Sequence, residues 1–262
     1  MKVKVLSDLH LEFSKPDTED LDPGTGDVLI LAGDICDAVA FVHRCDEELR
    51  GVYTRFFKRC VLGYDKVFYV MGNHEHYNGV FSTTADILRN NLPEGVTLLD
   101  NNSEFYNGWH FVGATMWSDF GKGDEKCKEA AQNGLNDYHA IFQSYDTCET
   151  INTNFIQNEN KNTIEWFKQC LPTLNGPVFV VTHHCPTFQS IDEDYTGSGV
   201  VTAYASDFSD LIEQHPNVLY WAHGHVHSSK RYTVGNCVVL SNPKGYPSEL
   251  NPDFDVNFSL EL

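Results

Sequence analysis

The feature that most constrains this chain is a short apolar run, residues 28–32, that ends in a glycine and an aspartate. The run Val-Leu-Ile-Leu-Ala is unbroken, which is typical of a strand buried on both faces in the middle of an α/β sheet. Gly33 ends it, and Asp34 and Asp37 follow at once. Open α/β sheets place ligand sites at the carboxyl ends of central strands, where an aspartate can bridge two cations. Alone, the pattern also fits an ordinary turn in which an aspartate caps a helix.

Four other predicted strands also end in residues that can bind metals. The strands cover residues 3–6, 67–70, 178–181 and 218–222, and they lead to Asp8 and His10, to Asn73 and His74, to His183 and His184, and to His225 and His227. Side chains two residues apart in a strand face the same way, so Asp8 and His10 can meet one cation. Asn73 can offer a neutral oxygen to a cation, which leaves His74 free to act on substrate. Repetition of this pattern five times predicts one metal site around Asp34.

Composition excludes several classes of partner. The 262 residues fit one large α/β domain, residues 1–262, and their formal net charge is −19 at pH 7. Such an acidic surface repels long nucleic acids and anionic membranes, whereas a small phosphate ester is less affected because bound cations reverse the local field. No apolar run approaches the roughly 20 residues that a membrane helix needs. The basic first residues lack the apolar region of a signal peptide, because Ser7 and Asp8 interrupt it.

The eight cysteines are scattered, and none forms a C-x-x-C pair. In a chain of this length without an export signal, they are expected to be reduced thiols in a cytoplasmic protein. Neither a disulfide framework nor a zinc finger is indicated. The oligomeric state is not indicated by the sequence.

The remaining elements are predicted from periodicity and turn residues. Helices are expected at residues 38–62, 85–91, 164–171 and 208–214, strands at 96–99, 103–106, 110–112 and 237–241, a hairpin turn at 107–108, and loops at 16–26 and 197–199.

The polar segment from residue 118 to residue 160 is either a lid over the site or a solvated insertion, because connections of this length are usually functional or disordered. It supplies Asn136 and Asp137, polar groups that could contact the organic part of a substrate. Because the predicted ligands lie elsewhere in the sequence, shortening this segment is expected to spare metal binding while changing the choice of substrate.

Taken in order, five blocks of sequence resemble the signature of the calcineurin-like metallophosphoesterases. They are Asp8-x-His10, Gly33-Asp34-x-x-Asp37, Gly72-Asn73-His74-Glu75, His183 and Gly224-His225-x-His227. The resemblance implies an α/β fold of the four-layer sandwich type, with two mixed β-sheets flanked by helices. It also implies two divalent or trivalent transition-metal ions, and the ligands alone do not choose among Mn, Fe and Zn.

The resemblance also implies a role for each site residue. Asp8, His10, Asp34 and His227 would hold one metal, and Asp34, Asn73, His183 and His225 would hold the other, with Asp34 as the bridge. The two metals would activate a water that attacks the phosphoryl group, His74 would donate a proton to the leaving oxygen, and Asp37 would orient a ligand or a group beside one.

Differences between this sequence and two groups of related phosphatases narrow the class of substrate. Purple acid phosphatases carry a tyrosine at the position of Asp37, and protein Ser/Thr phosphatases carry arginines where this chain has Ala38, Val39 and Met71. Without those guanidinium groups, a small phosphodiester or organic phosphate is favoured over a phosphoprotein.

Three segments, residues 115–119, 135–137 and 242–246, are similar to those of uncharacterised bacterial and phage members. His184 and Tyr246 join Asn136 and Asp137 as candidate substrate contacts. Two alternatives stay open: a metal-binding scaffold without activity, against which His74 argues, and a nuclease, against which the net charge argues.

Overall fold

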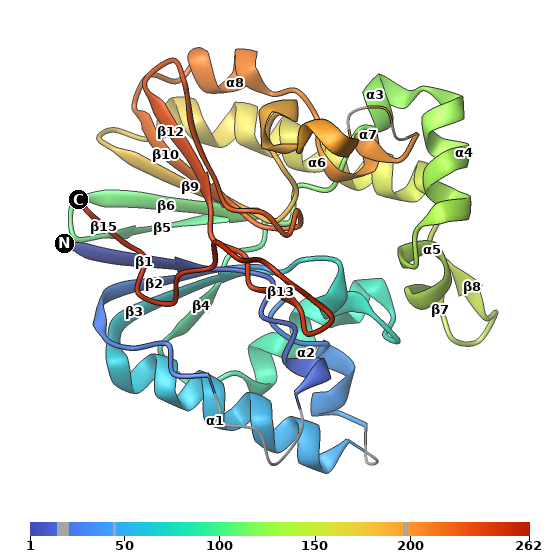
Figure 1. The fold of residues 1–262 in the computed structure, drawn as a ribbon, viewed down its shortest axis with the longest axis horizontal. Helices are drawn as coiled ribbons and strands as arrows, with labels where there is room; N and C mark the ends of the chain where they lie inside the picture. The colour runs from blue at the N-terminus through green and yellow to red at the C-terminus, as the bar shows by residue number, and fades with distance from the viewer. Residues whose placement is uncertain (15–20, 44–45, 196, 198) are drawn as a thin grey trace.

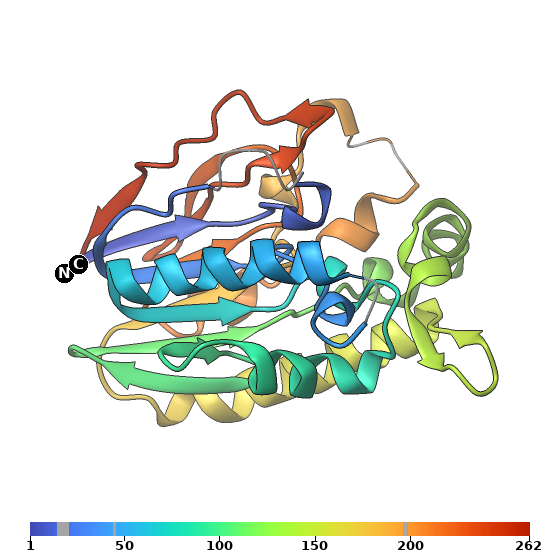
Figure 2. The ribbon, with the colours of Figure 1, turned by 90° about the horizontal axis from the view of Figure 1, so that it is seen from below.

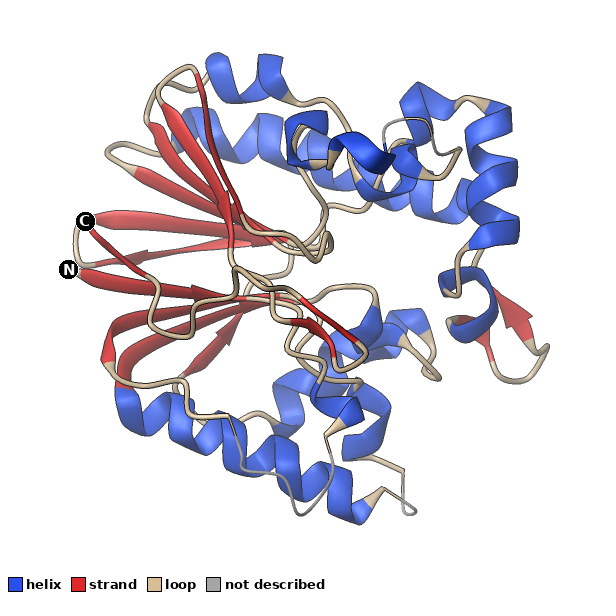
Figure 3. Ribbon diagram, in the orientation of Figure 1, coloured by secondary structure: helices blue, strands red, loops and turns tan. Residues whose placement is uncertain are grey.

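Two β-sheets pack face to face between two layers of helices in the computed structural model (Figure 1; Figure 3), which describes residues 1–14, 21–43, 46–195, 197 and 199–262. This arrangement confirms the predicted four-layer α/β fold. The predicted loops at 16–26 and 197–199 lie partly outside the described residues.

The first sheet has the strand order β15-β1-β2-β3-β4, in which β1 to β4 are parallel and β15 is antiparallel to β1. Their bounds are β1 (Lys2–Leu6), β2 (Gly26–Ala32), β3 (Tyr64–Val70), β4 (Val96–Leu98) and β15 (Ser259–Glu261). As predicted, β2 is buried on both faces: Val28, Ile30 and Ala32 enter the core between the sheets, whereas Leu29 and Leu31 enter the core under the helices.

The second sheet has the order β11-β12-β10-β9-β6-β5, with parallel inner strands and antiparallel outer ones. Its strands are β5 (Asn102–Tyr106), β6 (Trp109–Ala114), β9 (Val178–Thr182), β10 (Val218–His223), β11 (Lys230–Val234) and β12 (Cys237–Ser241). Asn107 and Gly108 both have positive φ, at 47° and 87°. Such angles are those of a tight hairpin turn, so the predicted turn is confirmed.

Helices cover the outer face of each sheet. On the first sheet lie α1 (Glu47–Gly63), which crosses the front of Figure 2, and α2 (Thr84–Asn91); on the second lie α6 (Thr153–Cys170) and α8 (Ser209–Glu213). None of the helices in the described part of the chain is both long and apolar enough to cross a bilayer. The seven cysteines among the described residues are free thiols.

Two predicted helices differ from those observed. The helix predicted over residues 38–62 is wrong at its start, because residues 38–41 form a separate 3-10 turn and α1 begins at Glu47. The acidic residues Asp46, Glu47 and Glu48 favour a helix start there through the helix dipole. The helix predicted at 164–171 begins earlier, at residue 153, where the Asn152 side chain accepts a hydrogen bond from the backbone N–H of Phe155.

The polar segment 118–160 lies beside the carboxyl ends of the strands (Figure 1) and packs around a small core. This core includes Phe120, Tyr138, Ile141 and Ile156 of the segment together with Trp117 and Ala203. The elements of the segment are α3 (Phe120–Gly123), α4 (Glu125–Gly134), α5 (Asp137–Ala140), β7 (Phe142–Ser144), β8 (Glu149–Thr150) and the start of α6. Elsewhere lie α7 (Val201–Tyr204), β13 (Gly245–Tyr246), β14 (Glu249–Leu250) and the 3-10 turns Leu11–Phe13, Ala38–Phe41, His74–His76, Phe81–Thr83, Leu171–Thr173, Phe188–Ser190 and Glu193–Tyr195.

Candidate metal centre

The seven predicted metal ligands lie close together in the structure, although the first and last of them, Asp8 and His227, are far apart in the sequence. Each follows the carboxyl end of a parallel strand: Asp8 and His10 follow β1, Asp34 follows β2, Asn73 follows β3, His183 follows β9, and His225 and His227 follow β10. Because the two sheets pack face to face, their carboxyl ends bring these side chains together.

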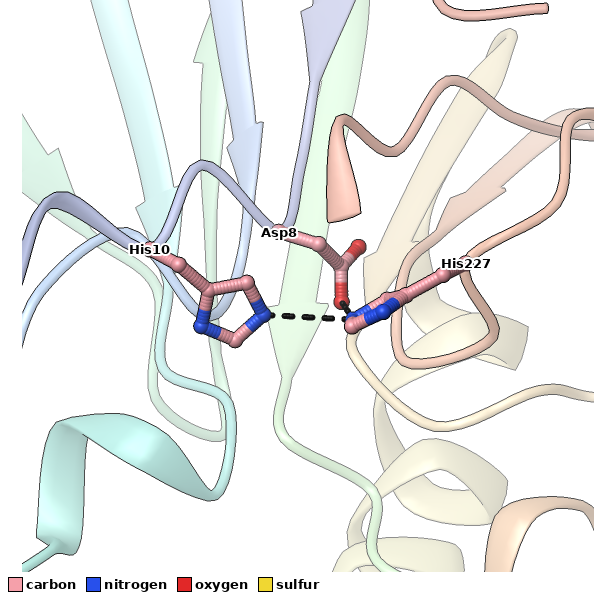
Figure 4. A group of neighbouring side chains, drawn as sticks. All are labelled: Asp8, His10 and His227. Carbon is pink, nitrogen blue, oxygen red and sulfur yellow. Dashed lines mark hydrogen bonds and ion pairs between the residues drawn. The ribbon is translucent and has the colours of Figure 1, made fainter. Parts of the chain in front are cut away.

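One group of donor atoms is formed by Asp8, His10 and His227, which point toward one another in Figure 4. Nε2 of His10 lies 3.2 Å from Nε2 of His227, and Oδ1 of Asp8 lies 3.5 Å from the same His227 nitrogen. Oδ2 of Asp34 lies 3.9 Å from Nε2 of His10. Asp34 and His10 also form a group with His74, in which the donor atoms lie within 4.8 Å of one another, so Asp34 borders the first group through His10.

A second group surrounds Nε2 of His183. This nitrogen lies 3.3 Å from Oδ2 of Asp34, 3.1 Å from Oδ1 of Asn73 and 3.2 Å from Nδ1 of His225. The same oxygen of Asp34 thus faces both groups, as the sequence predicts for a bridging carboxylate.

The chemistry of these donors fits metal ions. Nδ1 of His183 donates to the carbonyl of Ala32 at 2.9 Å, so Nε2 presents its lone pair to the oxygens of Asp34 and Asn73. These lone pairs need a cation between them, which is a proton on Nε2 when no metal is bound and a metal ion when the site is filled. Ligand atoms bound to one metal at about 2.1 Å lie roughly 3 to 3.5 Å apart, and the observed spacings lie close to that range. Oδ2 of Asp8, which is buried, has no protein partner among the described residues.

The backbone around the site is shaped for these contacts. Asp8, His10, Asp34 and His225 all have φ between 48° and 70°, a region that non-glycine residues enter at some energetic cost and that is common at functional sites. A Cβ atom at Gly72 would lie 2.2 Å from Oδ1 of Asp34. The glycine before Asn73 is therefore required by the close approach of the bridging carboxylate.

The carboxylates of the site attract positive charge. Burial alone would raise the pKa of Asp34, but the imidazoles of His183, His74 and His10 outweigh it and hold that pKa well below its usual value. Burial would lower the pKa of His183, but the charge of Asp34 raises it to about 10. A cation at this position is favoured for the same electrostatic reason.

His74 is held beside the two groups by a residue that the sequence analysis did not single out. Oε1 of Glu12 accepts hydrogen bonds from Nδ1 of His74 at 2.8 Å and from Nδ1 of His10 at 2.9 Å. Nε2 of His74 lies 2.9 Å from the hydroxyl of Tyr246, and its ring stacks on Tyr77. Burial would lower the pKa of His74, but Asp34 and Glu12 raise it to about 9. Glu12 lies in the 3-10 turn Leu11–Phe13 and Asp8 and His10 have positive φ, so the strand alternation expected from the sequence does not apply here and could not have indicated Glu12.

Glu75 supports the loop that carries Asp34. Its buried carboxylate accepts hydrogen bonds from the backbone N–H groups of Asp34, Ile35, Cys36 and Gly72 and from the hydroxyl of Tyr69. The sequence indicates Glu75 only as part of the family signature. Its supporting role is not visible there because its partners lie up to 41 positions away. Burial and the charge of Asp34 raise the pKa of Glu75 to about 7.

The other candidate residues have varied surroundings. The Asp37 carboxylate accepts a hydrogen bond from Tyr53 on α1 at 2.5 Å. His184 is 2 % exposed, and its ring centre lies 4.2 Å from that of His225. Asn136 is exposed, whereas Asp137 is buried and bonded to Asn73. Tyr246 contacts His74. The metal-binding role of the seven ligands, the catalytic roles of His74 and Asp37 and the four substrate contacts all stay predictions.

Comparison with known proteins identifies the family. The model of the calcineurin-like phosphoesterases matches residues 1–229. The chain belongs to that family. A protein of Acanthamoeba polyphaga mimivirus, described as uncharacterized, is 27 % identical over 274 residues, which cover 95 % of this chain and 92 % of the viral protein.

Solved structures show the same fold. The phosphopantetheinyl hydrolase of Mycobacterium tuberculosis superposes with a TM-score of 0.67 and 17 % identity, over 94 % of this chain and 90 % of that one. A Thermus thermophilus protein superposes with a TM-score of 0.51 and 15 % identity, over 92 % of this chain and 88 % of that one. As a calcineurin-like phosphoesterase, the protein is a metal-dependent hydrolase of phosphoric esters. The family typically binds a dinuclear metal centre, for which this chain has candidate Asp and His groups.

Proposed function

We propose that this calcineurin-like phosphoesterase hydrolyses a small phosphodiester or other small organic phosphate at the centre around Asp34. The observation that carries the proposal is the position of Asp34 Oδ2, which faces His10 on one side and His183 on the other. Two transition-metal ions held by these groups would supply Lewis acidity toward the phosphoryl oxygens and activation of a water nucleophile. Mn, Fe and Zn all suit carboxylate, amide and imidazole ligands.

His74 is the proposed general acid. Its raised pKa keeps the imidazole protonated at neutral pH, so that Nε2 can give a proton to the leaving oxygen. Glu12 holds Nδ1 and so directs Nε2 toward the hydroxyl of Tyr246. This hydroxyl is a candidate contact for the leaving group.

The groups bonded to the predicted ligands support a diester over a monoester, although the cationic side chains of His74 and Lys244 interact with Glu12 nearby. Among the described residues, the side chains bonded to the seven ligands are carboxylates, imidazoles, an amide and a hydroxyl, with no lysine or arginine. A diester carries one negative charge at neutral pH and a monoester nearly two, so a monoester has more need of a cationic side chain. The name of the similar Mycobacterium tuberculosis protein, a phosphopantetheinyl hydrolase, is compatible with an organic phosphate substrate.

Segment 118–160 is the proposed selector of substrate, because its helix α5, which exposed Asn136 precedes, lies at the end of the sheets that carries the metal ligands. A net charge of −19 argues against long nucleic acids and anionic membranes as partners. Cytoplasmic location stays a prediction.

A substrate panel tests the proposal. Bis-p-nitrophenyl phosphate, p-nitrophenyl phosphate, cyclic nucleotides and single-stranded DNA are each supplied with Mn²⁺. We expect the diester bis-p-nitrophenyl phosphate to be hydrolysed with a higher kcat/KM than the monoester, and DNA to be a poor substrate. A clear monoester preference would contradict the diester assignment, rapid cleavage of DNA would favour a nuclease, and no hydrolysis of any member would favour the inactive scaffold.

A further inference from the structure

Asp137 is the first residue of α5, in a segment that lies 64 positions away from Asn73 in the sequence. Only 6 % of Asp137 is exposed. Its position is fixed by backbone bonds between this segment and the loop after Asn73: the N–H of Asn78 donates to the carbonyl of Ala140 at 2.7 Å, and the N–H of Phe142 donates to the carbonyl of Gly79 at 2.9 Å. The segment and the loop therefore form one supported unit.

The Asp137 carboxylate has two donors. Nδ2 of Asn73 donates to its Oδ1 at 2.9 Å, and the hydroxyl of Tyr77 donates to the same oxygen at 2.6 Å. Because Oδ1 of Asp137 accepts from both Nδ2 of Asn73 and the hydroxyl of Tyr77, the NH₂ end of the Asn73 amide faces Asp137. The opposite end of that amide, Oδ1, then points to the group around Nε2 of His183, at 3.1 Å.

An asparagine amide has two ends of nearly equal size and opposite polarity. If it turned over, its NH₂ group would face the cation site, and an NH₂ group does not bind metals. Something must therefore hold the oxygen end toward the site. Tyr77, whose ring stacks on His74 at 4.1 Å, is itself held by Asp137.

We infer that Asp137 is a positioning residue that turns the Asn73 amide oxygen toward the metal held by Asp34, Asn73, His183 and His225. The segment 118–160 is thereby part of the metal centre and not only a cover for it. This inference rests on the proposed metal-dependent function, because it takes Asn73 as a ligand.

The test measures Mn²⁺ binding by titration of the metal-free full chain, alongside metal content. Asp137→Leu keeps the approximate size of the side chain and removes the acceptor. We expect it to weaken one of the two Mn²⁺ sites by about 10- to 100-fold, as loss of a hydrogen bond to a ligand commonly does, and to leave the other site within about threefold. Asp137→Asn, which retains one acceptor oxygen, should restore most of the affinity. Asp146→Leu, at an exposed turn of the same segment, is the matched control and should bind as the wild type does.

The same substitution made in an Asn73→Asp variant distinguishes positioning of the Asn73 amide from general support of the fold. In Asn73→Asp the ligand has an oxygen at both ends, so no orientation is required. Asp137→Leu should then cost less than about threefold, because the reason for its effect is gone. An equal loss of Mn²⁺ affinity in both backgrounds would overturn the inference in favour of a purely structural role, and so would unchanged binding by Asp137→Leu in the wild-type background.

Misfolding of the leucine variant and failure of the proposed function can each be distinguished from failure of this inference. If the leucine variant does not fold, Asp137→Ala gives the same comparison with a residue that suits a helix. If the wild-type chain binds none of Mn²⁺, Fe²⁺ and Zn²⁺, the proposed function fails. If it binds two ions and the Asp137 variants also bind two with unchanged affinity, only this inference fails.

Discussion

Oε1 of Glu12 lies 2.8 Å from Nδ1 of His74, and the same oxygen accepts a hydrogen bond from the predicted ligand His10. One carboxylate thus fixes the orientation of the proposed acid and of a metal ligand. Donor atoms of His74, His10 and Asp34 lie within 4.8 Å of one another, so His74 borders the metal centre, and its bond to Glu12 leaves Nε2 free to face the hydroxyl of Tyr246.

His74→Ala is expected to lower kcat strongly while metal content stays near two ions per chain. General acid catalysis contributes roughly 10² to 10⁴ in rate, and the loss should be largest for a leaving group that must be protonated. Steady-state kinetics on an alkyl ester and on a p-nitrophenyl ester check this expectation, because p-nitrophenolate leaves readily without a proton. Equal losses on both esters would count against the acid role.

Glu75→Ala is expected to destabilise the fold by about 3 kcal/mol or more, because several buried backbone N–H groups lose their acceptor at once. Glu75→Gln should also be destabilising, since its amide presents a donor to other donors. Urea unfolding with and without a chelator measures the effect apart from metal binding. The control is Glu94→Ala, at an exposed position; a loss for Glu75→Ala no larger than for this control would show that the Asp34 loop does not depend on Glu75.

Asp37 gives a pH-dependent prediction. Burial raises its pKa from 3.8 to about 6, against the lowering effect of the Tyr53 hydrogen bond. A carboxyl group whose pKa is higher in the folded state favours folding below pH 3.8, and this contribution is lost as the pH rises through about 6. Asp37→Asn should therefore raise the melting temperature relative to wild type at pH 8 but not at pH 3.5, with a difference in unfolding free energy of up to about 3 kcal/mol.

The same variant examines the predicted catalytic role of Asp37. If Asp37 acts only through Tyr53 and the fold, kcat at pH 7 should change less than about threefold, far below the 10² or more of a lost acid–base group. A large fall in kcat with an unchanged stability profile would support the catalytic role instead.

The ends of the strands could be predicted from the sequence because their signals are local. The unbroken apolar run before Gly33 predicts a strand that is buried on both faces. Because Asp34 directly follows this strand, it lies at the carboxyl edge of the sheet. The contacts that support the site could not be predicted in this way. Glu75 bonds to residues 39 to 41 positions away, and the orientation of the Asn73 amide depends on Asp137 through packing between distant segments.

The segment 118–160 shows the same limit. Because the predicted ligands lie elsewhere in the sequence, the sequence alone predicts that shortening the segment spares metal binding. The backbone bonds between the segment and the loop after Asn73 join distant residues and leave no local pattern in the sequence. The contact between Asp137 and Asn73 now predicts the opposite result. Replacing residues 122–153 with a Gly/Ser linker should weaken metal binding as well as change the choice of substrate.

Titration of the metal-free protein with Mn²⁺, followed by bis-p-nitrophenyl phosphate hydrolysis, tests the central claim most directly. Because Asp34 Oδ2 faces both donor groups, we predict that activity rises steeply toward the second equivalent of metal and that Asp34→Asn loses most of its metal and its activity. Full activity with one equivalent, or Asp34→Asn that retains two ions per chain, would contradict a centre built on a shared carboxylate.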